Sequence, residues 1–400
     1  MANTRRKPGA MGPFVEDYRS RLEQVGYTVG STRVKLKELG HLGRWMSDAG
    51  LAVEALDETR VEEFFTGWRS HGRRGLPTLA SFALLLEMLR EQQVIAEKIT
   101  PAPTALDVLI GRYRTWLVED RGLAAATVLR YENLARRFLQ DQSSDAGEVD
   151  FAGLTGAKVS AFLLAECGRV SVGSAKGRVA ELRSLLTFLY VAGLVPTALA
   201  ASVPPVAGWR HTTVPRSVTA QQVQDLLDSC DRSCAVGVRD FAILMMVSRL
   251  GLRSAEVARM ELGDVVWRVG ELAVRGKARR QDRLPLPFEV GEALAAYLVD
   301  GRPDFDDRHV FLTARAPHRP IRPAVVSDVV RRACRRVGIE PVGAHRLRHG
   351  LAATMLANGA ALVDISQVLR HQDLATTAIY AKVDVGSLRQ VALPWPEGRP

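Results

Sequence analysis

Leu369-Arg-His-Gln-Asp-Leu-Ala-Thr-Thr-Ala-Ile-Tyr380 lies near the end of this 400-residue chain and places a histidine nine residues before a tyrosine. Two upstream segments carry related chemistry, Gly251-Leu-Arg-Ser-Ala-Glu256 and Ala344-His-Arg-Leu-Arg-His349. Together the three segments supply arginines, histidines and a late tyrosine in a fixed order. The rest of the sequence is interpreted around this ordered set of cationic and nucleophilic side chains.

Side chains of these types suit a pocket that attacks a phosphodiester. Such attack requires neutralisation of the charge on the non-bridging oxygens, an in-line nucleophile and a proton for the leaving oxygen. Arg253 and Arg348 are candidates for the first task, because a guanidinium holds two phosphate oxygens and keeps its charge. Tyr380 is the candidate nucleophile, since its phenol would form a covalent phosphotyrosine that conserves the energy of the bond.

The local sequence around each arginine favours an anion nearby. His345 and Arg348 are three residues apart in the first turn of an expected helix, so they share a face where the helix dipole favours negative charge. We expect Ser254 to cap a helix directly after Arg253, which puts that arginine beside free backbone N–H groups. Glu256 is expected to orient a histidine or an arginine rather than to act as a base.

Lys277 follows Gly276 in a turn expected between two strands. This position suits a mobile donor, which would protonate the departing 5′ oxygen. The sequence contains neither a Gly-rich phosphate loop nor the clustered acidic residues that two-metal nucleases use, so we expect no cofactor and no metal.

The four cysteines, at 167, 230, 234 and 334, indicate a reducing compartment without a disulfide framework. Cys230 and Cys234 have the spacing of half a metal site. No second Cys/His pair lies at a suitable distance, so ordinary helix positions are the favoured interpretation.

Bulk composition limits the classes of partner. The formal net charge is +10, from 54 basic and 44 acidic residues, and such an excess favours polyanions, nucleic acid first. The chain is 47% hydrophobic, with no apolar run of transmembrane length. The Met1–Lys7 segment has charges but no apolar stretch after them, so it does not resemble a signal peptide. We expect no membrane association.

Two proline-rich stretches, Thr100–Thr104 and Val203–Pro215, divide the chain. The predicted domains are residues 1–100 and 101–200, a linker at 201–215, and a third domain at 216–400. The length agrees with two or three domains.

The first two regions are predicted to be all helical. Gly26–Trp45 and Gly122–Leu139 each combine a small-residue turn, a threonine near the start and apolar residues at helical spacing. Two tandem modules from an internal duplication are one interpretation, and a general similarity between small helical bundles is the other.

The third region is predicted to be mixed, with a small antiparallel sheet on one side of a helical domain. The expected strands are 265–268, 271–275 and 283–286. The expected helices are 220–227, capped by Thr219, and 240–250, 254–260, 289–298, 323–337, 345–358 and 363–369. The fold class is therefore mainly α, with two N-terminal all-helical modules and a C-terminal α+β domain.

The motifs resemble the tyrosine recombinase, or phage integrase, family across the whole third region. They are the Gly-Leu-Arg-x-x-Glu box, the Gly-Lys pair of the strand turn, the His-x-x-Arg box, and a second histidine nine residues before the tyrosine. This resemblance implies six catalytic residues, with Glu256 and His349 in support: Arg253, Lys277, His345, Arg348, His371 and Tyr380.

The same resemblance implies an architecture and partners. The second region resembles the core-binding domain of the family, a SAM-like helical domain that clamps the opposite face of the duplex. The first resembles the extra N-terminal helical domain of longer, three-part members. The family resemblance further implies four protomers acting on two duplexes at inverted-repeat or attachment-type sites, with the segment Val383–Val391 packed against a neighbour.

The run Ser248–Arg253 and the tail after Tyr380 look most like members encoded by bacterial insertion elements and transposons. A transposase role in the bacterial cytoplasm, at the nucleoid, with accessory recombinases as further partners, is the corresponding expectation. A type IB topoisomerase-like relaxase and a catalytically silent DNA-binding factor are the alternatives.

The chain departs from the family pattern at a few positions. Arg370 stands where the family often has Gly, Gly350 where it often has Thr, and Ser248-Arg249 where a Thr-Gly pair is common. None of these changes removes a charged or nucleophilic group, so we expect an active enzyme.

Further basic residues are candidates for contact with the DNA backbone. In the third region they flank the turn lysine, and in the two helical modules they lie on helices that could face a groove, with plain surface charge as the alternative. These residues are Arg279, Arg280, Arg136, Arg137, Arg33 and Lys35.

Overall fold

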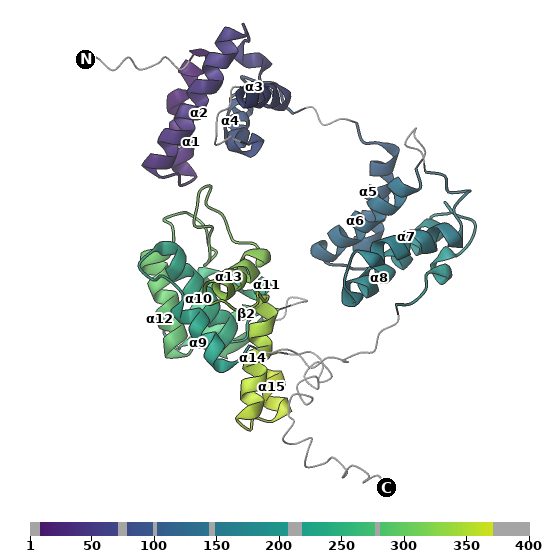
Figure 1. Cartoon of the computed structure of the whole chain (residues 1–400), viewed down its shortest axis with the longest axis vertical. Coiled ribbons are helices and arrows are strands. Elements are labelled where there is room, and N and C mark those ends of the chain that lie inside the picture. The colour runs from purple at the N-terminus through teal and green to yellow at the C-terminus, as the bar shows by residue number, and fades with distance from the viewer. Residues whose placement is uncertain are drawn as a thin grey trace. The chain divides into compact units, whose positions relative to one another are not determined.

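The computed structural model describes residues 9–70, 78–98, 102–143, 149–206, 218–276 and 281–370. The chain separates into two compact units, one formed by Met1–Lys98 with Thr213–Pro400 and the other by Ile99–Thr212. Figure 1 shows helices throughout both units. The mainly helical fold class predicted from sequence is confirmed.

The N-terminal region of the first unit is all helical where it is described. Its helices pack apolar and aromatic side chains into one core, in which Phe64 makes edge contacts with Phe82 and Trp45. The hydroxyl of Thr28 caps the longest helix by accepting a hydrogen bond from the backbone N–H of Ser31 at 3.3 Å. The elements are η1 (Gly9–Phe14), α1 (Val15–Gln24), α2 (Val29–Asp48), η2 (Val53–Ala55), α3 (Glu58–Ser70) and α4 (Leu79–Glu91).

The second unit is also all helical where it is described. It contains α5 (Ala105–Glu119), α6 (Ala125–Asp141), α7 (Gly156–Gly168), α8 (Val172–Val191) and η3 (Leu199–Ser202). The threonine expected near the start of α6 does not cap it. Ala124 is the N-cap, and Thr127 lies inside the first turn, because the chain is already helical from Ala125.

The C-terminal region of the first unit combines helices with a sheet. Its helices are α9 (Ala220–Asp228), α10 (Ala235–Arg249), α11 (Ser254–Ala258), α12 (Phe288–Ala296), α13 (Pro323–Arg336), α14 (Ala344–Ala357) and α15 (Leu362–Val368), with the shorter η4 (Leu262–Asp264) and η6 (Tyr297–Gly301). One hydrophobic core joins α9 to α14 and the sheet. Its centre is α10, which is buried along most of its length.

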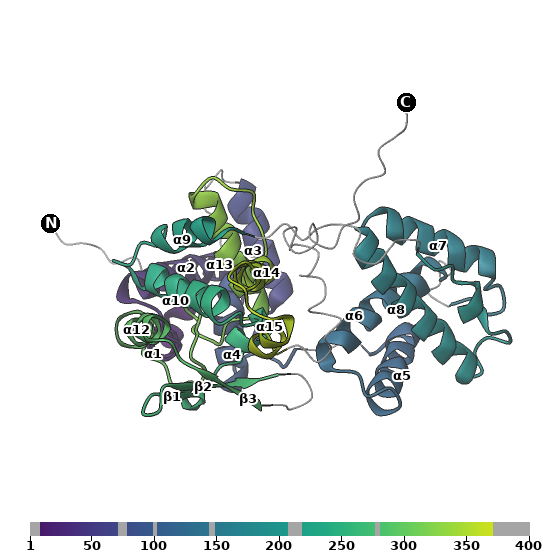
Figure 2. The same cartoon turned by 90° about the horizontal axis from the view of Figure 1, so that it is seen from below.

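The sheet in the described residues has three antiparallel strands in the order β1 (Val265–Val266), β2 (Glu271–Arg275) and β3 (Gln281–Pro285). Ala273 of β2 pairs with Arg283 of β3. Figure 2 shows the strands together along one side of the helices of this region, as predicted. They occupy positions close to those expected, and each outer strand differs by two residues or fewer at its ends.

One helix start and one helix cap differ from the prediction. The helix expected from residue 240 begins five residues earlier, because α10 starts at Ala235 and Asp240 is buried inside it. Its carboxylate instead accepts hydrogen bonds from Arg239 at 2.7 Å and Arg332 at 2.9 Å. Ser254 is the first residue of α11 rather than its cap. Arg253 is the N-cap, and the carboxylate of Glu256 binds its backbone N–H.

Two glycines allow close packing near the predicted catalytic segments. Gly251 has φ +59°, and a Cβ there would lie 2.8 Å from a methyl group of Leu369. Gly350 lies in α14, and a Cβ on it would lie 2.7 Å from the backbone oxygen of Val218. The threonine that the family often has at position 350 would therefore require the backbone to move here.

No helix among the described residues is long and apolar enough to cross a membrane.

Candidate active site

Arg253 lies at the junction between α10 and α11, where its backbone is extended. Its guanidinium donates to the carboxylate of Glu256 at 2.7 Å and to the backbone oxygen of Arg370 at 3.4 Å. The side chain remains 42% exposed. Arg253 is thus fixed on one side by protein and open to solvent on the other, as a side chain that binds an external phosphate must be.

Arg348 projects from α14 and is fully buried. Its guanidinium donates to the backbone oxygens of Gly251 and Leu369. The first oxygen belongs to the segment that carries Arg253, and the second lies at the end of α15. Arg348 therefore connects all three sequence segments from which the site was predicted.

His345 lies in the first turn of α14, and its ring meets that of His349 edge to face at 4.2 Å between centroids. Burial of the ring, followed by the positive charges of Arg348, Arg253 and Arg346, lowers the pKa of His345 below its ordinary value of 6.5. His345 is consequently neutral at neutral pH. His345 is nevertheless exposed to solvent.

Glu256 is a buried carboxylate at the centre of the site. Burial alone would raise its pKa, but the charges of Arg370 and Arg253 and the hydrogen bonds from Arg253 outweigh that effect and leave the pKa below its ordinary value. Glu256 is therefore ionised and accepts hydrogen bonds from both arginines.

Arg370 departs from the family pattern in sequence, and the sequence predicts no role for it. In the structure its guanidinium donates to Glu256 at 2.8 Å, and both side chains are only 5% exposed. Its backbone has φ +52°, in the left-handed region that favours glycine. The signal available in the sequence was a charged residue where the family often has glycine.

Several predicted residues lie outside the described residues: Lys277, Arg279, Arg280, His371 and Tyr380, with the segment Val383–Val391. The chain around them is described on one or both sides. Residues 277–280 connect β2 to β3, and His371 directly follows Arg370. Their catalytic and DNA-binding roles stay predictions.

The remaining candidates for DNA contact are in the helical modules, and most form ion pairs within the chain. Arg136 pairs with Asp107 at 2.7 Å, and Arg137 pairs with Glu166 at 2.8 Å. Both arginines remain about two-fifths exposed. In the other module Lys35 pairs with Glu38 at 2.9 Å, and Arg33 is exposed. Contact of these four residues with DNA remains a prediction.

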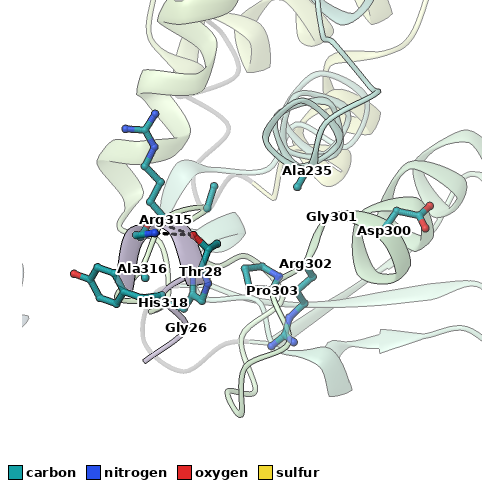
Figure 3. Close-up of a pocket in the computed structure, with 13 residues that line it drawn as sticks. Gly26, Thr28, Ala235, Asp300, Gly301, Arg302, Pro303, Arg315, Ala316 and His318 are labelled. Atoms are coloured by element: carbon teal, nitrogen blue, oxygen red, sulfur yellow. Dashed lines mark hydrogen bonds between the residues drawn. The ribbon is translucent and has the colours of Figure 1, made fainter. Parts of the chain in front are cut away.

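A separate pocket of about 500 Å³ lies in the first unit, between the turn at Gly26–Thr28 and the segments around Arg302 and His318 (Figure 3). None of the predicted catalytic residues lines it. The candidate active site is instead the open surface around Arg253 and His345, with Arg348 beneath it.

Known proteins are similar to this chain over most of its length. The model of the phage integrase family matches residues 216–386. The Sinorhizobium fredii protein y4rA, named as an integrase/recombinase, is 36% identical over 99% of this chain and 97% of its own length. The tyrosine recombinase XerD of Mycobacterium tuberculosis is 30% identical over 70% of this chain and 94% of its own.

Among solved structures, the fold is similar to that of the XerH site-specific recombinase bound to a palindromic difH substrate. The TM-score is 0.55 with 16% sequence identity, over 75% of this chain and 99% of that one. At this level of identity the likeness supports the fold.

Proposed function

The chain belongs to the phage integrase family of tyrosine recombinases, enzymes that break and rejoin DNA strands, and we propose that it recombines DNA at a specific site through a 3′-phosphotyrosine intermediate, without metal or ATP. Tyr380 is the proposed nucleophile.

The observation that carries the proposal is the convergence of two arginines on one short segment. Arg348 donates to the backbone oxygen of Leu369, and Arg253 donates to that of Arg370. His371 comes next in the chain, and Tyr380 follows nine residues later. The proposed phosphate-binding groups therefore contact residues 369 and 370, which directly precede the proposed nucleophile segment.

In the proposed cleavage step, the phenol oxygen of Tyr380 attacks the scissile phosphorus and forms the phosphotyrosine bond while the bond to the 5′ oxygen breaks. Arg253, which is 42% exposed, binds a non-bridging oxygen, and the buried Arg348 adds its positive charge from beneath, so both stabilise the charge that builds there. Lys277 gives its proton to the departing 5′ oxygen. Neutral His345 is suited to accept the phenol proton, because its lowered pKa keeps a ring nitrogen unprotonated at neutral pH.

Rejoining reverses these steps on a different strand. The free 5′-hydroxyl of the partner duplex attacks the phosphotyrosine, and Tyr380 leaves as the phenol. Because the covalent bond stores the energy of the original linkage, no nucleotide cofactor is required.

We further propose that four protomers act on two duplexes and that the enzyme mobilises a bacterial genetic element. The proposal of four protomers rests on the family resemblance. The proposal of a genetic element is supported by the name of the S. fredii relative, which spans nearly the whole chain, together with the family likeness of the tail. The +10 net charge supports binding to a duplex.

The test is covalent capture on nicked duplexes. A duplex nicked beside the cleavage position loses its short fragment after attack, so the adduct accumulates. The substrate is a pool with a randomised centre, nicked at successive positions. The wild-type chain is expected to form a stable protein–DNA adduct that Tyr380→Phe does not form. If no duplex yields an adduct, the chain is a DNA-binding factor rather than an enzyme.

The products on a captured site distinguish the remaining alternative. Two differently labelled duplexes that carry the site are expected to yield recombinant molecules. Relaxed circles from a supercoiled plasmid, without recombinants, would instead identify a type IB topoisomerase-like relaxase.

A further inference from the structure

The ion pair between Arg370 and Glu256 has no part in the reaction steps above, yet it lies at the centre of the site. Both side chains are 5% exposed, and the donor and acceptor atoms are 2.8 Å apart. Burying two charges is costly unless their geometry is good, and removing one partner leaves an uncompensated buried charge. Such a pair therefore constrains the positions of the groups around it.

Glu256 holds three groups with one carboxylate. One oxygen accepts from the guanidinium of Arg253 at 2.7 Å, and the other accepts from the backbone N–H of Arg253 at 2.8 Å. That second oxygen also accepts from Arg370. The direction of the Arg253 side chain thus depends on a carboxylate whose own position depends on Arg370.

The charge count of this cluster also matters for phosphate binding. Arg253 and Glu256 alone would form a neutral pair, and the carboxylate would repel an approaching phosphate. With Arg370 included, two guanidinium groups share one carboxylate, and the cluster carries a net positive charge. Arg370 is buried, whereas Arg253 is 42% exposed, so the excess charge is presented to solvent through Arg253.

The backbone of Arg370 joins the same network. Its φ of +52° turns the chain directly after α15, and its carbonyl oxygen accepts from Arg253 at 3.4 Å. An arginine at a position that favours glycine bears a conformational cost. That cost is offset here by the side-chain contacts, which a glycine could not make.

We propose that Arg370 is a positioning residue: through Glu256 it directs Arg253 toward the scissile phosphate and keeps the charge of Arg253 available to it. The inference rests on the proposed function and adds a residue to it. Arg370 does not touch the DNA in this account; it acts through Glu256.

Because glycine also adopts the left-handed backbone, substitutions at Arg370 can remove its charge and keep the turn. Arg370→Gly keeps the turn, since glycine adopts positive φ readily. It removes the ion pair with Glu256 and the hydrogen bond from the guanidinium to the backbone oxygen of Val368 at 3.2 Å. Arg370→Met keeps the length of the aliphatic side chain without the charge. Arg370→Lys restores a positive charge without the planar fork. Arg332→Met is the control, because it removes an arginine from another buried carboxylate, Asp240, whose hydrogen-bond donors are Arg332 and Arg239.

The measurement is the single-turnover rate of adduct formation on two DNA substrates that carry the captured site. One carries the natural phosphate at the cleavage position, and the other carries a methylphosphonate, which lacks the negative oxygen. If Arg253 is misdirected, attack on the charged phosphate slows, whereas attack on the uncharged methylphosphonate changes less. Rates are normalised to the wild-type rate on the same substrate.

We expect Arg370→Gly and Arg370→Met to lose about 10- to 100-fold on phosphate and much less on methylphosphonate, with DNA affinity unchanged. Arg370→Lys should recover part of the loss, and Arg332→Met should match the wild type on both substrates. Equal losses on the two substrates, or no loss in either uncharged variant, would overturn the proposal. Absence of any adduct with the wild-type chain would instead overturn the proposed function, and this inference with it.

Discussion

Arg348 connects the segments of the site, because its buried guanidinium donates hydrogen bonds to the backbone oxygens of Gly251 and Leu369. Its presence in the site was predictable from the order of the arginine, histidine and tyrosine motifs along the chain and from their resemblance to the family pattern. Its complete burial could not be predicted. Burial depends on Gly251 and Leu369 approaching α14 from sequence distances that no local pattern encodes.

The contact between Arg370 and Glu256 could not be predicted from sequence. The sequence shows a charged residue in place of a frequent glycine, which by itself gives no role. The role becomes visible only when the end of α15 meets the start of α11 and the guanidinium reaches Glu256.

His345 leads to a prediction of pH dependence. Burial and then the charges of Arg348, Arg253 and Arg346 hold its pKa below 6.5. The neutral form is therefore favoured in the folded chain. Its contribution to stability is complete above pH 6.5 and is lost as the pH falls through the lowered pKa. If neutral His345 accepts the phenol proton, adduct formation should decline only below pH 6.5.

The check is the single-turnover rate of adduct formation between about pH 5 and pH 8, for the wild type and for His345→Asn. The decline that belongs to His345 should be absent in the variant. A decline centred at or above pH 6.5 that disappears in His345→Asn would contradict the lowered pKa.

In helix α14, the glycine that stands where the family often has threonine is explained by packing. Gly350 lies against the backbone oxygen of Val218, where a Cβ would be only 2.7 Å away. This contact brings α14 close to the chain that leads into α9. A glycine inside a helix is locally unfavourable. Its presence is explained only by the backbone of Val218, which no local sequence pattern predicts.

A pair of matched substitutions tests this contact. Gly350→Ala should lower the free energy of unfolding by about 1–3 kcal/mol, because the backbone of Val218 must move. Gly291→Ala, in α12, meets only Leu286 at 3.6 Å, so it should stabilise by about 0.5–1 kcal/mol through helix propensity. Denaturant unfolding of the full chain measures both, and equal stability of the two variants would show that the close approach is absent.

The helix starts show why element boundaries were harder to predict than element types. Asp240 was the expected first residue of one helix, and Ser254 was the expected cap of the next. The carboxylate of Asp240 accepts a hydrogen bond from Arg332, 92 residues away. The N–H beside Ser254 is bound by Glu256, three residues after the true cap. Local preference was overridden once by a distant ion pair and once by a nearby carboxylate.

The order of the main structural regions along the chain was predictable from sequence. Proline-rich stretches and helical periodicity predicted helical modules followed by a mixed region, and the described residues have this organisation. The relation between modules is not encoded in any local pattern, and the proposed boundaries of the three domains stay predictions. In the second unit, the buried carboxylates of Glu132, Glu166 and Glu181 each hold arginines, so part of the basic excess has a structural use besides any contact with DNA.

The central claim is that a cationic pocket presents a phosphate to Tyr380, and the most direct test is to identify the residue that becomes linked to DNA. The captured adduct is digested with nuclease and trypsin, and the modified peptide is sequenced by mass spectrometry. We predict that the nucleotide is attached to Tyr380 in the peptide His371–Lys382. A nucleotide attached to any other residue would contradict the account.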